Sequence, residues 1–398
     1  MKNNYFNHLI MNSFMRLQFY CENENFKGYD PYDGLNSSIF LFIKNIKKTF
    51  FNIYWIQFFK RCPINFRKIF FIKKSYNPKS FALFLSGYCN LYKNNPQDVS
   101  FKKINYFIDK IIKTQINGYS GACWGYNFDW SSRAFFLKKN TPTIVVSSFI
   151  ANALLDAYEI TNDKNILNIA RSTCDFIIID LHRTYDDNNN LCFSYSPNDN
   201  TVVYNASLLG AALLARLYHY TQERELYILS KSAFAFCCNV QNDNGSWKYG
   251  FLKHHNWIDN FHTGYILTCL ANYEKYTLDN QFNPNLKKGF DFYINTFFTI
   301  QGESKYYDNS LYPIDTHSVA QLLVTLQSIN NFKQYQLKVQ KILEWTIKNM
   351  QSKKGFFYYQ IHKYYKIKIP YMRWTQAWMF YGLTTYINYN KLNFNNRV

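Results

Sequence analysis

The apolar positions of this chain follow two helical patterns that alternate along the sequence. Residues 143–158 are apolar or small almost all round, which predicts an inner helix with little water contact. Residues 165–180 carry apolar side chains on one face only, which predicts a half-exposed outer helix. The same pair of patterns is found at 79–92 with 99–115, 203–220 with 223–238, 259–276 with 285–298, and 315–329 with 333–350, and a last inner pattern covers 371–388.

A short aromatic motif, typical of a brief β-strand, precedes each inner pattern from residue 143 onwards. The motif ends in a tyrosine, and successive tyrosines are 69, 54, 58 and 52 residues apart. A serine or threonine follows in each inner helix at spacings of 59, 56, 55 and 57 residues. Two markers with one period indicate a single unit that is stacked several times. The tyrosines are Tyr126, Tyr195, Tyr249, Tyr307 and Tyr359, and the hydroxyl residues are Ser148, Ser207, Thr263, Ser318 and Thr375.

Six inner patterns predict an all-α fold in which six helical hairpins close into an (α/α)6 toroid, with short aromatic β segments at its mouth. Helices that are buried on all sides suit a closed barrel wall better than the wetted concave surface of an open solenoid. We expect residues 78–398 to form the toroid and residues 1–77 to form a basic N-terminal arm. Few residues follow the last inner helix, so we expect the apolar segment 38–60 of the arm to cover it.

The formal net charge of +19 favours anionic partners such as acidic sugars, lipid head groups or nucleic acid. A bias toward lysine and asparagine in the source genome accounts for part of this excess. The sequence contains none of the common nucleic-acid-binding motifs, so we expect no nucleic-acid partner. Nine cysteines without a CxxC motif indicate a reducing compartment. With no apolar signal-peptide region and no apolar run of membrane-spanning length, we expect a cytoplasmic location.

The segment 40–74 interleaves aromatic residues with nine lysines and arginines. Such a segment could form a basic amphipathic surface for anionic lipid, which would place the protein at the inner face of the membrane. The interpretation that we favour from sequence is a helix that packs on the toroid and keeps its lysines in solvent, because charge runs usually mark solvated faces.

Candidate catalytic residues lie in the loops and first turns before the inner helices, which converge on one mouth in a closed ring. Asp259 with His262 and Asp315 with His317 occupy matching points of two neighbouring repeats, and Asp129 precedes an earlier inner helix. Carboxylates and imidazoles can serve as general acids and bases. Each residue also has a structural interpretation, because Asp259 and Asp315 could simply be helix N-caps and a histidine could be a satisfied core residue.

Substrate-binding residues are expected among the aromatic and arginine side chains near the same mouth. Aromatic faces stack on sugar rings, and an arginine can hold a carboxylate by two hydrogen bonds. The tryptophans could alternatively be core residues. No standard zinc spacing, GxSxG elbow, phosphate loop or dinucleotide fingerprint is present, so we expect neither a metal nor a cofactor. The candidates are Trp124, Tyr126, Arg133, Trp247, Tyr249, Trp257, Tyr371, Arg373 and Trp374.

Seven segments carry a resemblance to known proteins: GYDPYDGLNS (28–37), WGYNFDW (124–130), ALLDAYEIT (153–161), FSYSP (193–197), LLGAALLARLY (208–218), WIDNFHTGY (257–265) and IPYMRWTQAWM (369–379). They resemble a bacterial family that occurs in surface-polysaccharide gene clusters, and the hairpin period resembles the six-hairpin glycosidase toroids. Members of that bacterial family are sometimes labelled delta-aminolevulinic acid dehydratase, a label that this helical pattern argues against because that enzyme is a β/α barrel. A squalene-type cyclase is disfavoured because the DxDD motif is absent.

The resemblance and the candidate residues together predict a carbohydrate-active protein of surface-polysaccharide biosynthesis. It would act on an oligosaccharide or a lipid-linked glycan by hydrolysis, elimination or epimerisation, and the positive charge favours an acidic sugar. The alternative is a non-catalytic, glycan-binding or scaffolding toroid that organises glycosyltransferases at the membrane face. The fold by itself does not choose between these functions.

Overall fold

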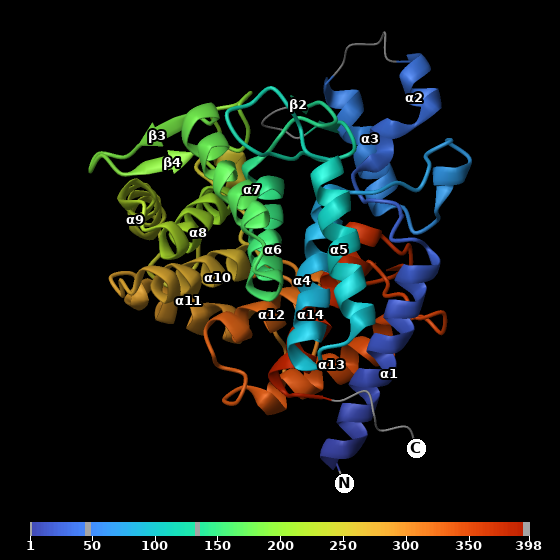
Figure 1. The fold of residues 1–398 in the computed structure, drawn as a ribbon. Coiled ribbons are helices and arrows are strands. Elements are labelled where there is room, and N and C mark those ends of the chain that lie inside the picture. Colours follow the sequence, from blue (N-terminus) through green and yellow to red (C-terminus); the bar gives the residue numbers. More distant parts are fainter. Residues whose placement is uncertain (1, 44–48, 132–135, 393–398) are drawn as a thin grey trace.

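The computed structural model describes residues 2–43, 49–131 and 136–392 and confirms the (α/α)6 toroid (Figure 1). Each inner helix packs against the next, and the last one returns to the first, so the ring is closed. Their apolar, all-round patterns arise because each inner helix contacts two inner neighbours and an outer helix. The inner helices are α4 (Pro78–Asn94), α6 (Ile144–Thr161), α8 (Tyr204–Thr221), α10 (Asn260–Thr277), α12 (Thr316–Ser328) and α14 (Trp378–Tyr389), the last preceded by a π-helical turn, Met372–Ala377.

The outer helices follow the predicted one-faced pattern, and each packs on the inner helix that precedes it. Only α6 among the described helices has the length and hydropathy of a membrane span, and 61% of it is buried inside the ring. It is therefore a core helix. The outer helices after these inner ones are α5 (Asp98–Lys113), α7 (Lys164–Asp175), α9 (Arg224–Asn239), α11 (Asn283–Thr296) and α13 (Gln336–Met350).

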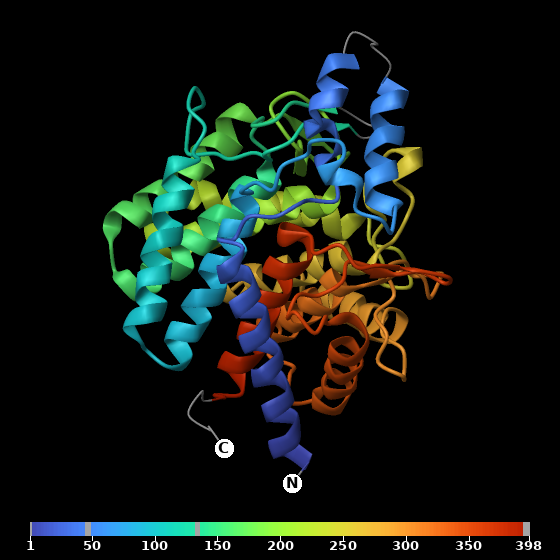
Figure 2. The ribbon, with the colours of Figure 1, turned by 90° about the vertical axis from the view of Figure 1, so that its right-hand side faces the viewer.

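The sixth outer helix is α1 (Lys2–Asn23), which packs against α13 and α14 (Figure 2). Phe14 of α1 meets Phe380 of α14 with ring centroids 5.1 Å apart. The expectation that segment 38–60 covers the last inner helix is therefore wrong. Residues of the predicted N-terminal arm form part of the ring, while the domain boundary before residue 78 stays a prediction.

The aromatic motifs hold neighbouring hairpins together through their backbones. The first N–H of one inner helix donates to the tyrosine carbonyl of the next motif, as from Ile144 to Tyr195 at 3.0 Å and from Asn260 to Tyr306 at 2.9 Å. The fourth motif thus ends functionally at Tyr306, one residue before the predicted Tyr307. Met372 N–H donates in the same way to the Tyr29 carbonyl at 3.0 Å, which makes Tyr29 the missing sixth motif.

Among the described residues, the β structure consists of two short antiparallel pairs and one small three-stranded sheet, in agreement with the predicted short β segments. β1 (Trp130–Ser131) pairs with β2 (Phe136–Leu137), and β3 (Arg183–Tyr185) pairs with β4 (Leu191–Phe193). β5 (Ile314–Asp315), β6 (Gln360–Ile361) and β7 (Lys366–Ile367) form one small antiparallel sheet. These segments form the loops from which the inner helices begin.

Residues 30–77 form an insertion between the Tyr29 motif and α4, here called the mouth insertion. It contains a 3-10 turn (Asp33–Asn36), α2 (Ser38–Ile43), α3 (Thr49–Arg61) and a second 3-10 turn (Phe66–Lys68). The buried Arg67 guanidinium donates to Asp33 at 2.7 Å and to the Asp30 carbonyl at 2.8 Å. Both charged groups are buried and paired, so this bond joins the two ends of the insertion, and the guanidinium also lies over the Tyr371 ring, 4.8 Å from its centroid.

Candidate active site

Asp259 and His262 form a carboxylate–imidazole pair at the start of α10. Asp259 is the N-cap of this helix, and its Oδ1 accepts from the His262 backbone N–H at 3.0 Å. Its Oδ2 lies 2.7 Å from His262 Nδ1 and accepts from Trp257 Nε1 at 2.9 Å. An ionised carboxylate only accepts, so the proton of the neutral imidazole is on Nδ1 and Nε2 is left as an acceptor.

The two members of this pair differ in exposure. The Asp259 side chain is 1% exposed, whereas the His262 side chain is 22% exposed. Among the described residues, no hydrogen bond engages His262 Nε2. A buried carboxylate thus orients an imidazole whose free nitrogen can reach a bound molecule, which is the arrangement that a general base requires.

His317 of α12 forms a buried hydrogen-bonded cluster with Tyr265 and Lys79. Its Nε2 lies 2.9 Å from Tyr265 Oη, and Lys79 Nζ donates to the same oxygen at 3.5 Å. The His317 ring stacks on Phe261 and Trp378, with centroids 4.5 and 4.3 Å away. Its Nδ1 is buried and has no partner in the described part of the chain.

The electrostatics of this cluster disfavour positive charge. Burial lowers the pKa of Lys79 well below its ordinary value, and the neighbouring Arg373 lowers it further. The pKa of His317 is likewise well below its ordinary value because of burial and then the nearby Lys79 and Arg373. Burial also raises the pKa of Tyr265, so this phenol keeps its proton. Tyr265 can therefore donate a hydrogen bond to the neutral His317 imidazole.

Both carboxylate oxygens of Asp315 accept hydrogen bonds from buried protein groups. Its Oδ1 caps α12 by accepting from His317 N–H at 2.9 Å, and its Oδ2 accepts from Gln360 Nε2 at 2.7 Å. Trp374 Nε1 also donates to Oδ2, at 3.4 Å. The residue is fully buried, and this burial raises the pKa of its carboxyl to about 6 although the hydrogen bonds oppose the shift. Asp315 thus matches the N-cap interpretation and positions the start of the helix that carries His317.

Arg373 is held by Asp30 of the Tyr29 motif. Its Nε and an Nη donate to the two carboxylate oxygens at 2.6 and 2.8 Å, and both side chains are 5% exposed. The guanidinium also lies over the Tyr126 ring, 5.2 Å from its centroid. Because Asp30 already neutralises it, Arg373 is poorly suited to the predicted task of binding a substrate carboxylate.

The aromatic candidates divide into mouth residues and core residues. Trp257 is 37% exposed and stacks on Tyr249 with centroids 4.4 Å apart. Tyr249 in turn lies 4.8 Å from the His262 ring, and Trp374 lies 5.1 Å from the His317 ring. The residues that the structure brings together around the mouth are Tyr126, Tyr249, Trp257, Asp259, His262, Asp315, His317, Arg373 and Trp374.

Three predicted substrate-binding residues belong to the core, which corrects the sequence interpretation. Trp124 is fully buried and its indole N–H donates to the Ile111 carbonyl of α5 at 2.9 Å. Trp247 repeats this contact with the Cys237 carbonyl of α9, also at 2.9 Å. Tyr371 is fully buried beneath the mouth insertion, where its hydroxyl donates to the Phe59 carbonyl.

The remaining two candidates, Asp129 and Arg133, follow the Tyr126 motif in the sequence. Asp129 accepts from the Lys139 backbone N–H at 2.7 Å, so its carboxylate takes part in that loop. Arg133 lies outside the described residues. Sequence analysis missed Lys79 and Tyr265. Tyr265 follows His262 by three residues, on the same helical face, and Lys79 is a charged residue in an otherwise apolar inner helix. Both features, the helical spacing of Tyr265 and the charge of Lys79, can be recognised in the sequence.

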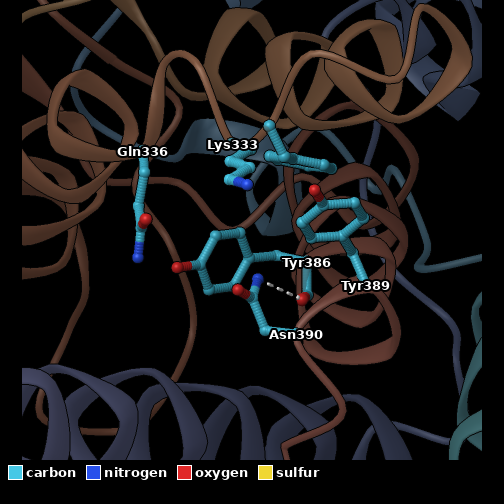
Figure 3. A pocket seen from close by; sticks show the side chains of 6 residues that line it. Lys333, Gln336, Tyr386, Tyr389 and Asn390 are labelled. Atoms are coloured by element: carbon cyan, nitrogen blue, oxygen red, sulfur yellow. Dashed lines mark hydrogen bonds between the residues drawn. The ribbon is translucent and has the colours of Figure 1, made fainter.

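No metal cluster of histidine, cysteine, aspartate or glutamate occurs in the described ranges. A small pocket between α13 and α14 lies at the C-terminal end of α14, the opposite end from Trp378 and His317 (Figure 3). It contains no carboxylate or imidazole, so the mouth remains the candidate site. The pocket is lined by Phe332, Lys333, Gln336, Tyr386, Tyr389 and Asn390.

No protein-family model matches this chain, and no curated protein matches its sequence. Its fold is similar to that of cellobiose 2-epimerase from Bacillus thermoamylovorans B4167, with a TM-score of 0.60 and 12% identity over 77% of this chain and 87% of that one. An unsaturated glucuronyl hydrolase specific for heparin gives a TM-score of 0.60 and 11% identity over 98% of both chains. A D-mannose isomerase gives 0.57 and 13% over 79% of this chain and 86% of that one. At these identities the likeness establishes the toroid fold.

Proposed function

We propose that this protein is a carbohydrate-active enzyme that moves a proton at a carbon next to a sugar carbonyl, as an epimerase or isomerase does. The observation that carries this proposal is the Asp259–His262 pair, which offers an oriented and partly exposed imidazole nitrogen. The fold supports the sugar class, because the similar structures named above are a sugar epimerase, a glycuronyl hydrolase and a sugar isomerase.

The reaction would begin with proton abstraction by His262. Its Nε2 takes the proton from the carbon, the C–H electron pair moves to form an enediolate, and the carbonyl oxygen gains the negative charge. Tyr265 Oη carries one O–H, which lies 2.9 Å from His317 Nε2 in the free protein and can turn to donate a hydrogen bond to that oxygen. The His262 imidazolium then returns the proton to either carbon of the enediolate, which gives the isomer or, after the enediolate has rotated, the epimer. The ring of Phe261 separates the two imidazoles, with centroids at 4.1 and 4.5 Å.

Glycoside hydrolysis is less well supported by these side chains. It commonly needs two available carboxyl groups, one as acid and one as base or nucleophile. Asp259 and Asp315 both cap helices, and the four carboxylate oxygens all accept hydrogen bonds from protein groups. Elimination from a uronate needs a cation for the substrate carboxylate. Arg373 is the obvious cation, and it is paired with Asp30.

The test is solvent deuterium exchange. Reducing mono- and disaccharides and hexuronates are incubated with the protein in D2O and followed by NMR. We expect deuterium at the carbon next to the carbonyl and the appearance of an epimer or isomer. New reducing ends without carbon-bound deuterium would instead establish hydrolysis, and an unsaturated sugar would establish elimination. Either result would overturn the proposal.

A second candidate is a non-catalytic glycan-binding toroid. The observation that favours it is the exposed aromatic pair at the mouth, Trp257 stacked on Tyr249, which can bind a sugar face without chemistry. Calorimetric binding of a glycan in the absence of any deuterium exchange would select this function. A role in surface-polysaccharide biosynthesis and a cytoplasmic location remain part of the proposal, and they rest on the sequence resemblance and composition.

A further inference from the structure

The mouth insertion presents an apolar face that nothing in the described chain covers. On α3, three exposed aromatic residues follow one helical face at spacings of three and four: Phe51, Tyr54 and Phe58. Tyr54 is 73% exposed. Beyond the helix, Ile64, Ile69 and Phe71 are each more than half exposed. Six large apolar residues exposed within 21 positions of the chain suggest an interaction site.

The opposite face of α3 already accounts for its packing on the ring. Lys60 Nζ donates to Tyr32 Oη at 2.8 Å, and Trp55 Nε1 donates to the Gly34 carbonyl at 3.0 Å. Ile56 and Phe59 are buried on this face. Of the outward aromatic residues, Phe51 stacks on Phe40 and Phe58 stacks on Phe66 within the insertion, each while more than a third exposed, and Tyr54 is the most exposed of the three.

The charge around this face has one sign. No aspartate or glutamate occurs between Asp33 and Asp98. Arg61, Lys68 and Lys73 are exposed between the apolar residues. Three further lysines, Lys44, Lys47 and Lys48, belong to the same stretch and lie outside the described residues. A partner with negative charge and an apolar interior complements such a surface, and an anionic lipid bilayer has both properties.

We propose that this surface, hereafter the lipid-binding face, docks the protein on an anionic membrane. It consists of Phe51, Tyr54, Phe58, Ile64, Ile69 and Phe71 with Arg61, Lys68 and Lys73. The aromatic and aliphatic side chains enter the interface, and the basic side chains contact lipid phosphates. Figure 1 shows α2 and α3 standing out from the ring.

This docking also narrows the substrate class, a step that rests on the proposed function. Lys60 lies 6.0 Å from the Trp374 ring, so α3 borders the mouth as well as the lipid-binding face. A membrane under α3 would bring the mouth close to the lipid head groups. The substrate would then be the sugar of a lipid-linked glycan instead of a free sugar in solution.

The experiment is co-sedimentation of the full chain with vesicles of phosphatidylglycerol and phosphatidylcholine, against vesicles of phosphatidylcholine alone. We expect binding to the anionic vesicles at low salt. Reversal of Arg61, Lys68 and Lys73 to Glu should weaken it on the order of a hundredfold or more, since each lost basic contact is worth about fivefold. Replacement of Tyr54, Ile64 and Ile69 by Ser should also abolish binding without lowering the melting temperature, because each of these side chains is more than half exposed.

The matched control reverses Lys287, Lys341 and Lys348, which are exposed on α11 and α13. This variant has the same charge change as the first one and should keep its binding. Equal loss in both would show that only the net charge of +19 attracts the vesicles, and it would overturn the proposal. So would the absence of binding to anionic vesicles, or dimers in ultracentrifugation that the Ser variant converts to monomers. Sedimentation measures membrane binding and requires no turnover. A negative deuterium-exchange result would therefore overturn the proposed function and leave the test of membrane binding unaffected.

Discussion

Arg373 and Asp30 lie 343 residues apart in the chain and join through two hydrogen bonds of 2.6 and 2.8 Å. Next to them, Met372 N–H donates to the Tyr29 carbonyl. The ion pair thus lies where the last inner helix meets the Tyr29 motif. It adds a side-chain contact to the backbone hydrogen bond that closes the ring.

Replacement of Arg373 by Gln should destabilise the protein strongly. It leaves the Asp30 carboxylate buried without its cation, and such a loss costs about 3–5 kcal/mol. The double variant Asp30→Asn with Arg373→Gln removes the isolated charge and should recover most of that free energy of unfolding. Urea denaturation of both variants measures this. Equal destabilisation in the single and the double variant would contradict a specific ion pair.

Replacement of His262 by Gln should lower turnover by about 10²- to 10⁴-fold, the usual contribution of a general base. Asp259→Asn should also lower turnover while the melting temperature stays nearly unchanged, because Asn is a good N-cap. The amide cannot accept from Nδ1–H in the way the carboxylate Oδ2 does, so it no longer fixes the tautomer.

The control for that pair is Asp315→Asn, which also keeps an N-cap. It should leave turnover within a few-fold of the parent protein if Asp315 is structural. If Asp315→Asn loses turnover and Asp259→Asn does not, the base assigned here is the wrong one.

The difference in stability between the parent protein and the Asp315→Asn variant should depend on pH in a defined direction. Burial raises the pKa of Asp315 to about 6 from 3.8, so the folded state binds a proton more tightly than the unfolded state. Its stabilising contribution is complete below about pH 4 and is lost as the pH rises through about 6. The Asn variant lacks this loss. Relative to the parent protein, it should gain up to about 3 kcal/mol between pH 4 and pH 7, measured by urea unfolding.

Lys79 should make stability rise with pH on the alkaline side. Its folded pKa is lowered by burial, so the unfolded state binds more protons until the pH exceeds the ordinary lysine value. Lys79→Met should remove this slope from melting temperatures measured between pH 7 and about pH 9. Lys79→Arg should destabilise the protein throughout, because arginine cannot lose its proton. An unchanged slope in the Met variant would contradict the assignment.

Trp124→Phe and Trp247→Phe should affect stability alone. Each leaves a buried helix carbonyl without its indole donor, which costs about 1–3 kcal/mol. Trp257→Ala should instead weaken glycan binding by up to roughly tenfold, the value of one aromatic contact, with little change in melting temperature. Thermal melts and calorimetric titration of the three variants measure the difference. Weaker glycan binding in the Trp124 variant at an unchanged melting temperature would return that residue to the site.

The sequence alone determined the helical hairpins, because each buried helix face requires apolar residues at a regular spacing in the chain. Residues 143–158 had to be apolar all round, since α6 is enclosed by its neighbours. The N-cap roles of Asp259 and Asp315 could also be predicted from the sequence, because an N-cap side chain accepts its hydrogen bond from a residue in the first turn of its own helix. Even α1 carried a readable signal, as its buried stripe follows the helical spacing Phe6, Ile10, Phe14, Leu17 and Cys21. Other apolar residues in the same segment obscured it.

Only the tertiary structure decided which of these residues share a site. Lys79 and Tyr265 are 186 residues apart and meet because α4 and α10 face the same axis of a closed ring. The closure of the ring also brings Asp30 to Arg373. Because Arg373 pairs with Asp30, it is not available to bind the carboxylate of an acidic sugar, as the sequence had suggested. Trp124 and Trp257 look alike in sequence, yet one indole points to an outer helix and the other to the mouth. Local spacing records whether a side chain is buried, whereas its partner across the ring depends on how six hairpins pack together.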